Sequence, residues 1–351
     1  LEAGAVVNAQ AKPTEAFVAE VAELQNKPDE SMQEAEAEAK RQRLEAFFEE
    51  GSTALMYAAA LGHHDVVKVL VAAGADTRLK DKDGQSPLFH AANTGSTLSV
   101  VTLLDGGADA NDETPQGVPL LVHAIVSGSE TLAELLIKAG ANVGPTNGGV
   151  APLLLASQAG SSKLIQLLLS KGADVVAPSE SGVTPLMIVA AAGNLRAVKL
   201  LLDAAKETDV LSSVVDGTTE NGTAALHTAS RQAHTRVVQE LLAASASVGI
   251  RDLSGQTPLG AAFDGLQAVA KYVEEALQEY SATQDRKLGN DMLARAAGPH
   301  VEVMEMLLAN NAEPSLIDKE GNTVDAQAIV QTYRALSRDS PAELEGAKDE
   351  L

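Results

Sequence analysis

The 351-residue chain has no cysteine and no tryptophan, and aromatic residues make up 3% of it. Without cysteine there can be no disulfide, no thiolate metal ligand and no thiol nucleophile. Basic residues are few: 26 Lys and Arg against 48 Asp and Glu give a formal net charge of −22. Nucleic-acid binding relies on Lys and Arg to neutralise phosphates, so this balance argues against nucleic acid as a partner. It also argues against an anionic membrane surface.

The sequence also lacks an apolar run long enough to span a bilayer, so we expect no membrane insertion. Signatures of catalysis and of calcium binding are missing too. There is no G-x-x-x-x-G-K loop, no H-E-x-x-H, no G-x-S-x-G on a strand–helix turn and no D-x-D-x-D-G loop. Acidic pairs such as Asp29-Glu30 lie in solvated runs. We therefore expect no enzymatic activity, no cofactor and no metal site.

What the chain does contain is a repeated unit. Its clearest copy opens Gly84-Gln85-Ser86-Pro87-Leu88 and closes Gly107-Ala108-Asp109-Ala110-Asn111. Openings of this kind recur every 32 to 34 residues, with one longer interval between Gly182 and Gly222. The opening glycines are Gly51, Gly84, Gly117, Gly149, Gly182, Gly222, Gly255 and Gly289, with a degenerate ninth at Gly321.

Each copy predicts two short helices. A proline is tolerated in the first turn of the first helix, where its missing N–H costs nothing. Gly95 allows a sharp reversal, and Val100, Leu103 and Leu104 place the apolar face of a second helix on the core. The G-x-T-P-L-x-x-A-A opening, the period near 33 and the G-A-D exit resemble the ankyrin repeat. The resemblance implies an all-α solenoid of helix pairs with short hairpin fingers, in which each repeat packs on its neighbours.

This resemblance gives a predicted organisation. Residues 1–13 form a tail, 14–50 two N-terminal capping helices, and 51–320 eight ankyrin repeats. Residues 321–337 form a C-terminal capping helix, and 338–351 an acidic tail. For the Glu-rich stretch 29–48, a coiled coil or an acidic disordered run is the alternative to a cap.

Two departures from the pattern stand out. Between Ala204 and Gly222 there are about seven extra residues over the usual period. We expect a tolerated surface loop rather than a binding element, because loop extension costs little free energy. The copy at Gly289 has lost the Thr-Pro start, and Pro299-His300 stands where its inter-helix turn is expected.

The seven histidines do not form a metal site in this interpretation. Four of them (His63, His227, His234 and His300) stand where the ankyrin pattern itself often has histidine. His90 and His123 occupy the same position in adjacent repeats. Stacked helices lie about 8–10 Å apart, whereas a shared metal needs both ring nitrogens at about 2 Å. We therefore expect core packing or hydrogen bonding for these two.

The resemblance also implies where partners dock: on the finger tips and on the exposed side of the first helices. Val118, Val150 and Val183 follow three successive opening glycines and predict an apolar stripe, which Leu61 and Val126 extend within a polar rim. Packing of β-branched residues inside the fingers is the alternative. The predicted protein-binding residues are Leu61, Gln85, Asn93, Val118, Val126, Val150, Gln158, Val183, Arg231, Gln232 and Asp264.

The sequence ends Lys348-Asp349-Glu350-Leu351, which matches the endoplasmic-reticulum retrieval tetrapeptide. It begins with Leu rather than Met, so we expect an N-terminal targeting segment to be missing or removed. Together these features predict residence in the endoplasmic-reticulum lumen, with the KDEL receptor as one partner. Asn221-Gly222-Thr223 would then be an N-glycosylation site, although Asn-Gly is also ordinary turn chemistry.

We therefore predict a non-catalytic protein–protein interaction module of the endoplasmic-reticulum lumen, acting as a scaffold, adaptor or folding-assistance factor. Two alternatives remain open at this point. One is a cytosolic ankyrin adaptor whose C-terminus only imitates the signal. The other is an acidic lumenal protein that buffers calcium with low affinity.

Overall fold

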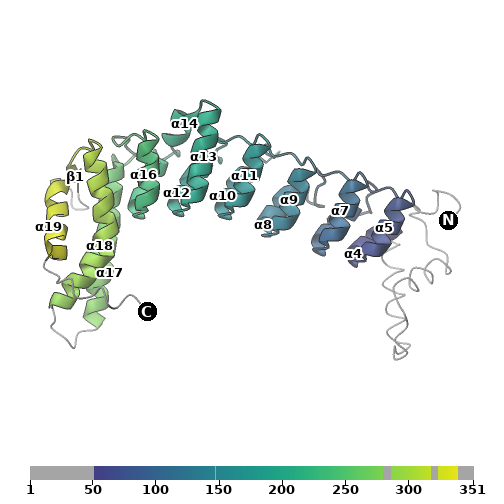
Figure 1. Cartoon of the computed structure of the whole chain (residues 1–351), viewed down its shortest axis with the longest axis horizontal. Coiled ribbons are helices and arrows are strands. Elements are labelled where there is room, and N and C mark those ends of the chain that lie inside the picture. Colours follow the sequence, from purple (N-terminus) through teal and green to yellow (C-terminus); the bar gives the residue numbers. More distant parts are fainter. Residues whose placement is uncertain (1–50, 147, 280–285, 318–322, 339–351) are drawn as a thin grey trace. The chain divides into compact units, whose positions relative to one another are not determined.

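The computed structural model describes residues 51–146, 148–279, 286–317 and 323–338 (Figure 1). It divides into two compact units, residues 1–146 and residues 147–351. The predicted tail and capping helices over 1–50 and the retrieval signal over 348–351 lie outside the described residues.

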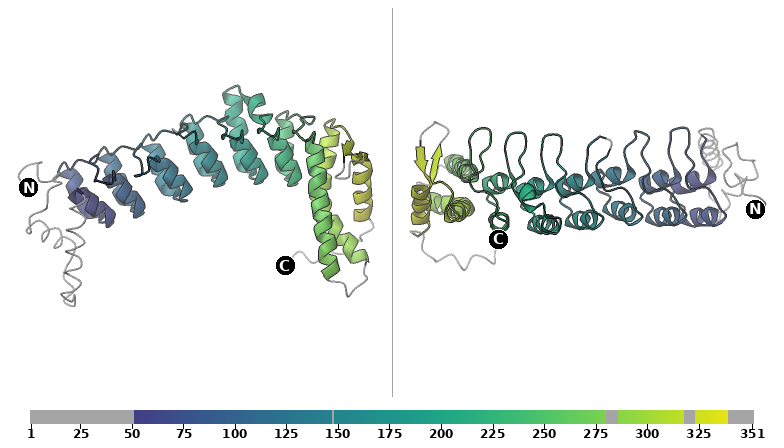
Figure 2. Two further views of the ribbon diagram at one scale, coloured as in Figure 1. Left: turned by 180° about the vertical axis from the view of Figure 1, so that it is seen from behind. Right: turned by 90° about the horizontal axis from the view of Figure 1, so that it is seen from above.

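The described part of the first unit is built of helix pairs, each with a seven-residue inner helix followed by a nine-residue outer helix. The pairs are α4 (Ala54–Ala60) with α5 (His64–Ala72), α6 (Pro87–Asn93) with α7 (Thr97–Asp105), and α8 (Leu120–Val126) with α9 (Glu130–Lys138). The loops between pairs form the fingers, which Figure 2 shows projecting from the inner-helix side. In one finger Glu113 and Pro119 form an antiparallel bridge.

The second unit begins in the same way and ends differently. Its helix pairs are α10 (Pro152–Gln158) with α11 (Ser162–Ser170), α12 (Pro185–Ala191) with α13 (Leu195–Glu207), and α15 (Ala225–Arg231) with α16 (Thr235–Ala243). Two long helices follow, α17 (Pro258–Glu279) and α18 (Arg286–Ala309). An antiparallel hairpin of β1 (Ser315–Ile317) and β2 (Thr323–Asp325) pairs Leu316 with Val324, and α19 (Ala326–Arg338) comes last. The predicted helical solenoid is confirmed, and α19 accounts for most of the predicted C-terminal capping helix.

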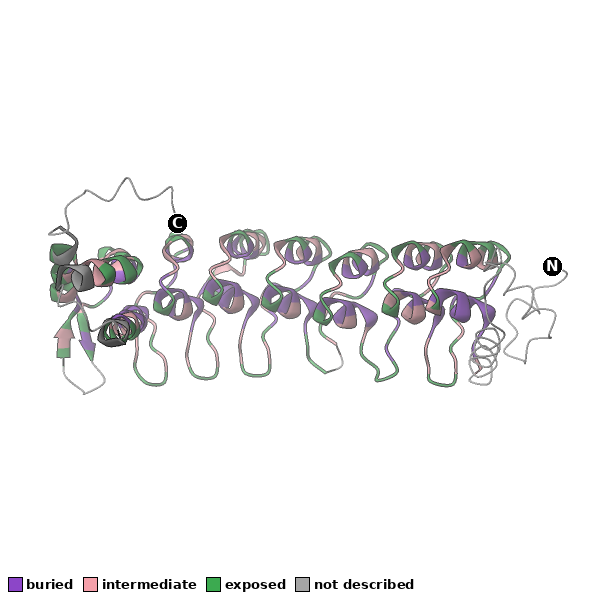
Figure 3. Ribbon diagram, turned by 90° about the horizontal axis from the view of Figure 1, so that it is seen from below, coloured by how far each residue is buried: buried purple, intermediate pink, exposed green. Residues whose placement is uncertain are grey.

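Local sequence explains why each inner helix starts where it does. The Ser86 hydroxyl accepts a hydrogen bond from the Phe89 amide, and Pro87 stands in the first turn. The opening glycine before each inner helix has positive φ, +76° at Gly84, which a residue with a Cβ rarely adopts. Leu88 and Ala91 then turn inward and are almost fully buried. The buried residues gather where helices face one another (Figure 3).

Neighbouring repeats are also joined by a recurrent hydrogen bond. The last carbonyls of a helix have no partner within the helix. Here a side chain from the inter-helix turn of one repeat donates to a carbonyl at or near the end of the preceding inner helix. The three pairs are Thr94 Oγ1 to Ala59 O (3.2 Å), Asn194 Nδ2 to Gly160 O (3.0 Å) and His234 Nε2 to Ala191 O (2.9 Å). His300, which lies within α18, makes a similar bond from Nε2 to Arg231 O at the end of α15 (3.1 Å). The positions of the turns are therefore fixed from one repeat to the next.

The structure corrects the prediction of an eighth repeat at Gly289. This residue lies inside α18, which runs without interruption from Arg286 to Ala309 and contains Pro299. The residues from Gly255 onward form one pair of elongated helices rather than the first of two short pairs. The reason is local: the stretch after Gly265 is rich in Ala, Leu, Glu and Gln, which are strong helix formers, so the helix continues past the expected turn.

The insertion between Ala204 and Gly222 is not a loop, which corrects the second expectation. Helix α13 runs on to Glu207, and a short helix, α14 (Leu211–Val215), follows it. Val214 and Val215 are each only 2% exposed. The insertion therefore carries its own apolar contacts and is part of the packed structure.

Replacing Val214 by Asp tests this packing. An unpaired carboxylate at a buried site should lower the free energy of unfolding by about 3 kcal/mol or more. The matched control is Ser212→Asp, two residues away on the exposed side of α14, which should change it by less than about 0.5 kcal/mol. Urea denaturation measures both, and equal small effects would show that α14 does not pack.

Candidate protein-binding surfaces

In the first unit, three of the predicted residues stand at the ends of inner helices. Leu61 caps α4, Asn93 is the last residue of α6, and Val126 is the last residue of α8. Leu61 is 44% exposed and Val126 is 70% exposed, and the Asn93 side chain is also exposed. A large apolar side chain at such exposure, repeated with a polar neighbour in the intervening repeat, makes a surface suited to protein contact.

The finger residues lie less openly. Val118 of the first unit is 37% exposed, and its carbonyl accepts a hydrogen bond from the Thr114 amide across the finger (2.8 Å). Gln85 holds the equivalent place in the preceding finger and is partly exposed. These two residues lie just before the inner helices, and their backbone carbonyls accept the hydrogen bonds that close the fingers.

In the second unit, Val150 is 38% exposed and Val183 is only partly exposed. The Val183 amide donates to Ser179 Oγ (3.1 Å), and its carbonyl accepts from the Ser179 amide (2.9 Å). Val118 belongs to the first unit, whereas Val150 and Val183 belong to the second. That the three valines form one stripe therefore stays a prediction. Gln158, at the end of α10, is exposed.

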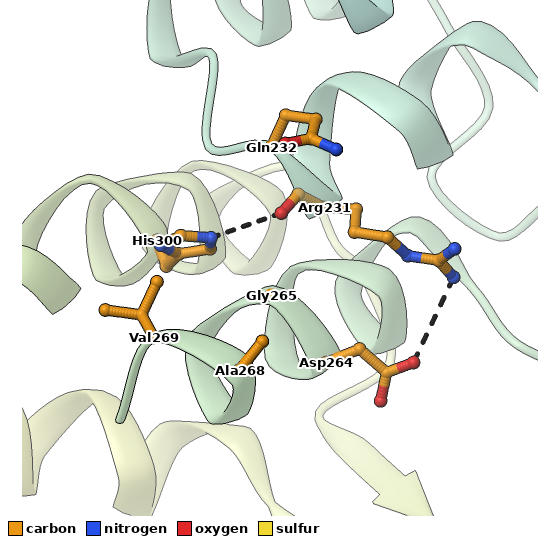
Figure 4. A pocket seen from close by; sticks show the side chains of 7 residues that line it. All are labelled: Arg231, Gln232, Asp264, Gly265, Ala268, Val269 and His300. Carbon is orange, nitrogen blue, oxygen red and sulfur yellow. Dashed lines mark hydrogen bonds and ion pairs between the residues drawn. The ribbon is translucent and has the colours of Figure 1, made fainter. Parts of the chain in front are cut away.

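The remaining three predicted residues meet at a pocket of about 450 Å³ in the second unit (Figure 4). Arg231 and Gln232 come from the end of α15, and Asp264 from α17. The pocket is also lined by Gly265, Ala268, Val269 and His300. It forms because α17 and α18 continue past the turn after α15, so that the faces of two long helices meet that turn.

Gly265 is essential to this arrangement. A Cβ added at this position would overlap the Arg231 carbonyl oxygen and meet His300 Nε2. Only glycine therefore lets α17 pass this close to the end of α15.

A hydrogen-bonded chain holds the polar side of the pocket. Arg231 Nη2 donates to Gln256 Oε1 (2.6 Å), and Gln256 Nε2 donates to Asp264 Oδ2 (2.8 Å). Arg231 Nη2 also lies 4.0 Å from Asp264 Oδ2, an ion pair half open to solvent. The Arg231 guanidinium group is thereby held beside Asp264 on the polar side of the pocket.

His300 forms the buried side of the pocket. Its Nε2 donates to the Arg231 carbonyl, and its Nδ1 is a buried acceptor without a hydrogen-bond partner among the described residues. Burial lowers the pKa of His300 below its ordinary value, so the ring is neutral near pH 7. Burial likewise lowers the pKa of His227, whose Nδ1 accepts from the Ala224 amide.

His90 and His123 make a hydrogen-bonding contact and a ring contact, respectively. His90 Nε2 lies 3.2 Å from Asp81 Oδ2, and the His123 ring centroid lies 6.4 Å from that of Phe89. Within the described residues, no group of three or more His, Asp or Glu side chains is arranged to hold a metal ion. Among the same residues, no helix has the length and hydropathy of a membrane-spanning segment.

The sequence did not reveal the apolar lining of the pocket. Its residues Gly265, Ala268 and Val269 follow the i, i+3, i+4 pattern of one helix face, which Tyr272 continues outside the pocket. This pattern predicts a lining face only when α17 is known to continue beyond Asp264.

Asn221, the predicted glycosylation site, lies at a finger with an exposed side chain, and its carbonyl accepts from the Leu253 amide (2.9 Å).

Comparison with known proteins identifies the family. The model of the family "Ankyrin repeats (3 copies)" matches residues 24–114, 95–179, 153–252 and 186–284, so the chain belongs to the ankyrin repeat family. This class is one of protein–protein interaction modules, and no enzyme family is indicated.

Solved structures that resemble the chain include two ankyrin repeat domains. One is that of human ASB11, with 26% identity, a TM-score of 0.46, and coverage of 59% of this chain and 90% of that one. The other is that of Bcl-3, described as a unique member of the IκB family, with 26% identity, a TM-score of 0.48, and coverage of 60% and 94%. No curated protein matches the chain.

Proposed function

We propose that this protein is a non-catalytic adaptor or scaffold that binds partner proteins through the exposed ends of its inner helices and the adjoining fingers. The observation that carries the proposal is the exposure of two large apolar side chains at the ends of inner helices: Leu61, the C-cap of α4, and Val126, the last residue of α8. Burying such side chains against a partner is favourable by about 25 cal/mol per Å² of apolar surface.

Exposed apolar residues also occur on the outer helices of the first unit, where Val69 is 59% and Leu98 is 62% exposed. Exposure of apolar residues alone therefore does not show which of the two surfaces binds the partner. That side is favoured because polar residues border its apolar ones: Asn93 at the end of α6 and Gln85 in the finger. An apolar centre with a polar border is the usual construction of a protein interface.

A photo-crosslinking amino acid placed at Val126 should therefore yield a discrete adduct with a partner when the full chain is expressed in cells. The matched control places the same amino acid at Val69, of similar exposure in the middle of an outer helix, and should yield none. Adducts from Val69 but not from Val126 would contradict the proposal.

We further propose that this adaptor resides in the endoplasmic-reticulum lumen. The support is the tetrapeptide Lys348-Asp349-Glu350-Leu351, which functions as a signal when its last carboxyl group is free, together with the exposed sequon at Asn221. Retrieval by the KDEL receptor would keep the protein among secretory clients and lumenal chaperones. A cytosolic adaptor is the competing assignment.

Protease treatment of microsomes from cells expressing the full natural protein tests the proposed location in the lumen. We expect protection that is lost on adding detergent, and a glycosidase-sensitive mass shift that disappears in Asn221→Gln. Extending the chain beyond Leu351 should cause secretion, because the signal is then no longer terminal. Digestion without detergent would contradict the proposed address.

A further inference from the structure

The charge of the second unit is distributed unevenly along its repeats. The stretches 149–173, 182–202 and 222–239 contain no Asp or Glu, although the chain has 48 acidic residues. They do contain Lys163, Lys171, Arg196, Lys199, Arg231 and Arg236. The corresponding helices of the first unit carry Asp65, Asp105, Glu130 and Glu134. The inter-helix turns and the beginnings of α11, α13 and α16 thus carry Lys and Arg without Asp or Glu and form a local positive region in a strongly acidic protein, whereas Asp203, Glu207 and Glu240 lie later in α13 and α16.

Three of these basic residues hold the same place in successive repeats. Lys163, Arg196 and Arg236 are each the second residue of an outer helix (α11, α13 and α16), and all three are exposed. We refer to these three residues as the basic row. Within the described residues, neither Arg196 nor Arg236 takes part in an ion pair.

This placement opposes the helix dipole. The N-terminal end of a helix carries partial positive charge, so acidic residues are favoured there and basic ones are disfavoured. Helices α5 and α9 follow the rule with Asp65 and Glu130 in their first turns, whereas α11, α13 and α16 have no acidic residue there. In three successive repeats a basic residue stands where the helix dipole favours an acidic one. This indicates that these basic residues have a role other than stabilising the helices.

The packing of α13 against α16 brings the row together. Lys199, one turn after Arg196, lies 2.9 Å from Glu240 of α16, so α13 and α16 lie side by side. Packed helices are about 8–10 Å apart, and an extended peptide advances about 3.3 Å per residue. Every third residue of an extended segment therefore matches one member of the row.

The row is held on a rigid base. Asn194 and His234, in the turns that precede α13 and α16, donate to carbonyls of the preceding repeats at 3.0 and 2.9 Å. Arg231, five residues before Arg236 along the chain, lines the pocket described above. Ala268, Val269 and Tyr272 extend one apolar helix face outward from that pocket, and Tyr272 is 73% exposed. Figure 1 shows α17 and α18 continuing beyond the end of α16, so this face borders the turns.

We propose that this surface of the second unit binds an extended acidic segment of a partner protein, with carboxylates on Arg196 and Arg236 and one apolar side chain in the pocket. The proposal rests on the protein-binding function given above and adds the chemistry of the partner. The net charge of −22 disfavours long polyanions such as nucleic acid, whereas a short acidic segment meets only the local positive region.

The direct test uses a fluorescent peptide of about ten residues with Glu at every third position and one Leu at its end, so that its charges match the row. Its binding to the full chain should weaken as ionic strength rises, because exposed charge pairs are screened. A matched peptide with Gln in place of each Glu should bind at least about tenfold more weakly.

The variant R196E/R236E should lower the affinity for the Glu peptide at least about tenfold, and R196Q/R236Q by an intermediate factor. The control is K68E/K138E, which makes the same change of charge on exposed lysines of the first unit and should leave binding unchanged. Circular dichroism melting checks that each variant is folded. Equal affinity of R196E/R236E and the control would overturn the proposal.

Competition identifies the class of ligand. If a single-stranded oligonucleotide or phosphatidylserine vesicles displace the peptide as well as unlabelled peptide does, the surface is a general anion site and the proposal fails. If removal of residues 339–351 raises the affinity about tenfold, the chain's own acidic end is the occupant, which also overturns it. Loss of crosslinking at Val126 with intact peptide binding would instead count against the proposed inner-helix interface alone.

Discussion

Every part of this structure depends on the packing of each repeat against the next. A helix pair with a seven-residue inner helix is too small to have a core of its own. Its apolar residues, such as Leu88, Ala91 and Leu103, are buried only because neighbouring helices cover them. Alanine on the inner helices allows close approach, and the side-chain hydrogen bonds from turn to carbonyl set the relative position of adjacent repeats.

This packing leaves certain positions in each repeat open to solvent, always in the same place. The end of the inner helix, the turn that follows and the second residue of the outer helix recur on one edge. Because the frame fixes these positions, a substitution there changes the surface without disturbing the core. In the first unit these exposed positions carry apolar residues, Leu61 and Val126. In the second unit they carry basic residues, Arg196 and Arg236. The long helices α17 and α18 add a side to the second surface, which turns an open edge into a pocket.

Much of the fold was predictable from the sequence. The opening glycines, the Ser-Pro and Thr-Pro starts and the apolar spacing each act within a few residues, so the helix pairs up to α16 follow from local physics. The failures arose where tertiary packing decides. Asp264-Gly265 has the sequence of an inter-helix turn, yet Gly265 serves to let α17 pass the Arg231 carbonyl. Val214 and Val215 lie in a stretch with turn-like serines and are buried all the same. The pocket could not be predicted, because its lining depends on α17 continuing. Arg231 and Asp264 hold the same position in adjacent repeats, so their proximity could be predicted. That they and Gln232 line one pocket could not.

The central claim is that recognition takes place on the edge formed by inner-helix ends and inter-helix turns. The first amides of α13 and α16 have no acceptor four residues earlier in the helix, so a segment bound across the turns should slow their exchange with solvent. Backbone hydrogen exchange of the full chain, with and without the Glu peptide, therefore tests the claim most directly. The account predicts slower exchange in residues 191–199 and 231–240, with no change at the C-terminal ends of the outer helices. Slower exchange confined to the outer-helix ends, or no change at the turns on saturation, would contradict it.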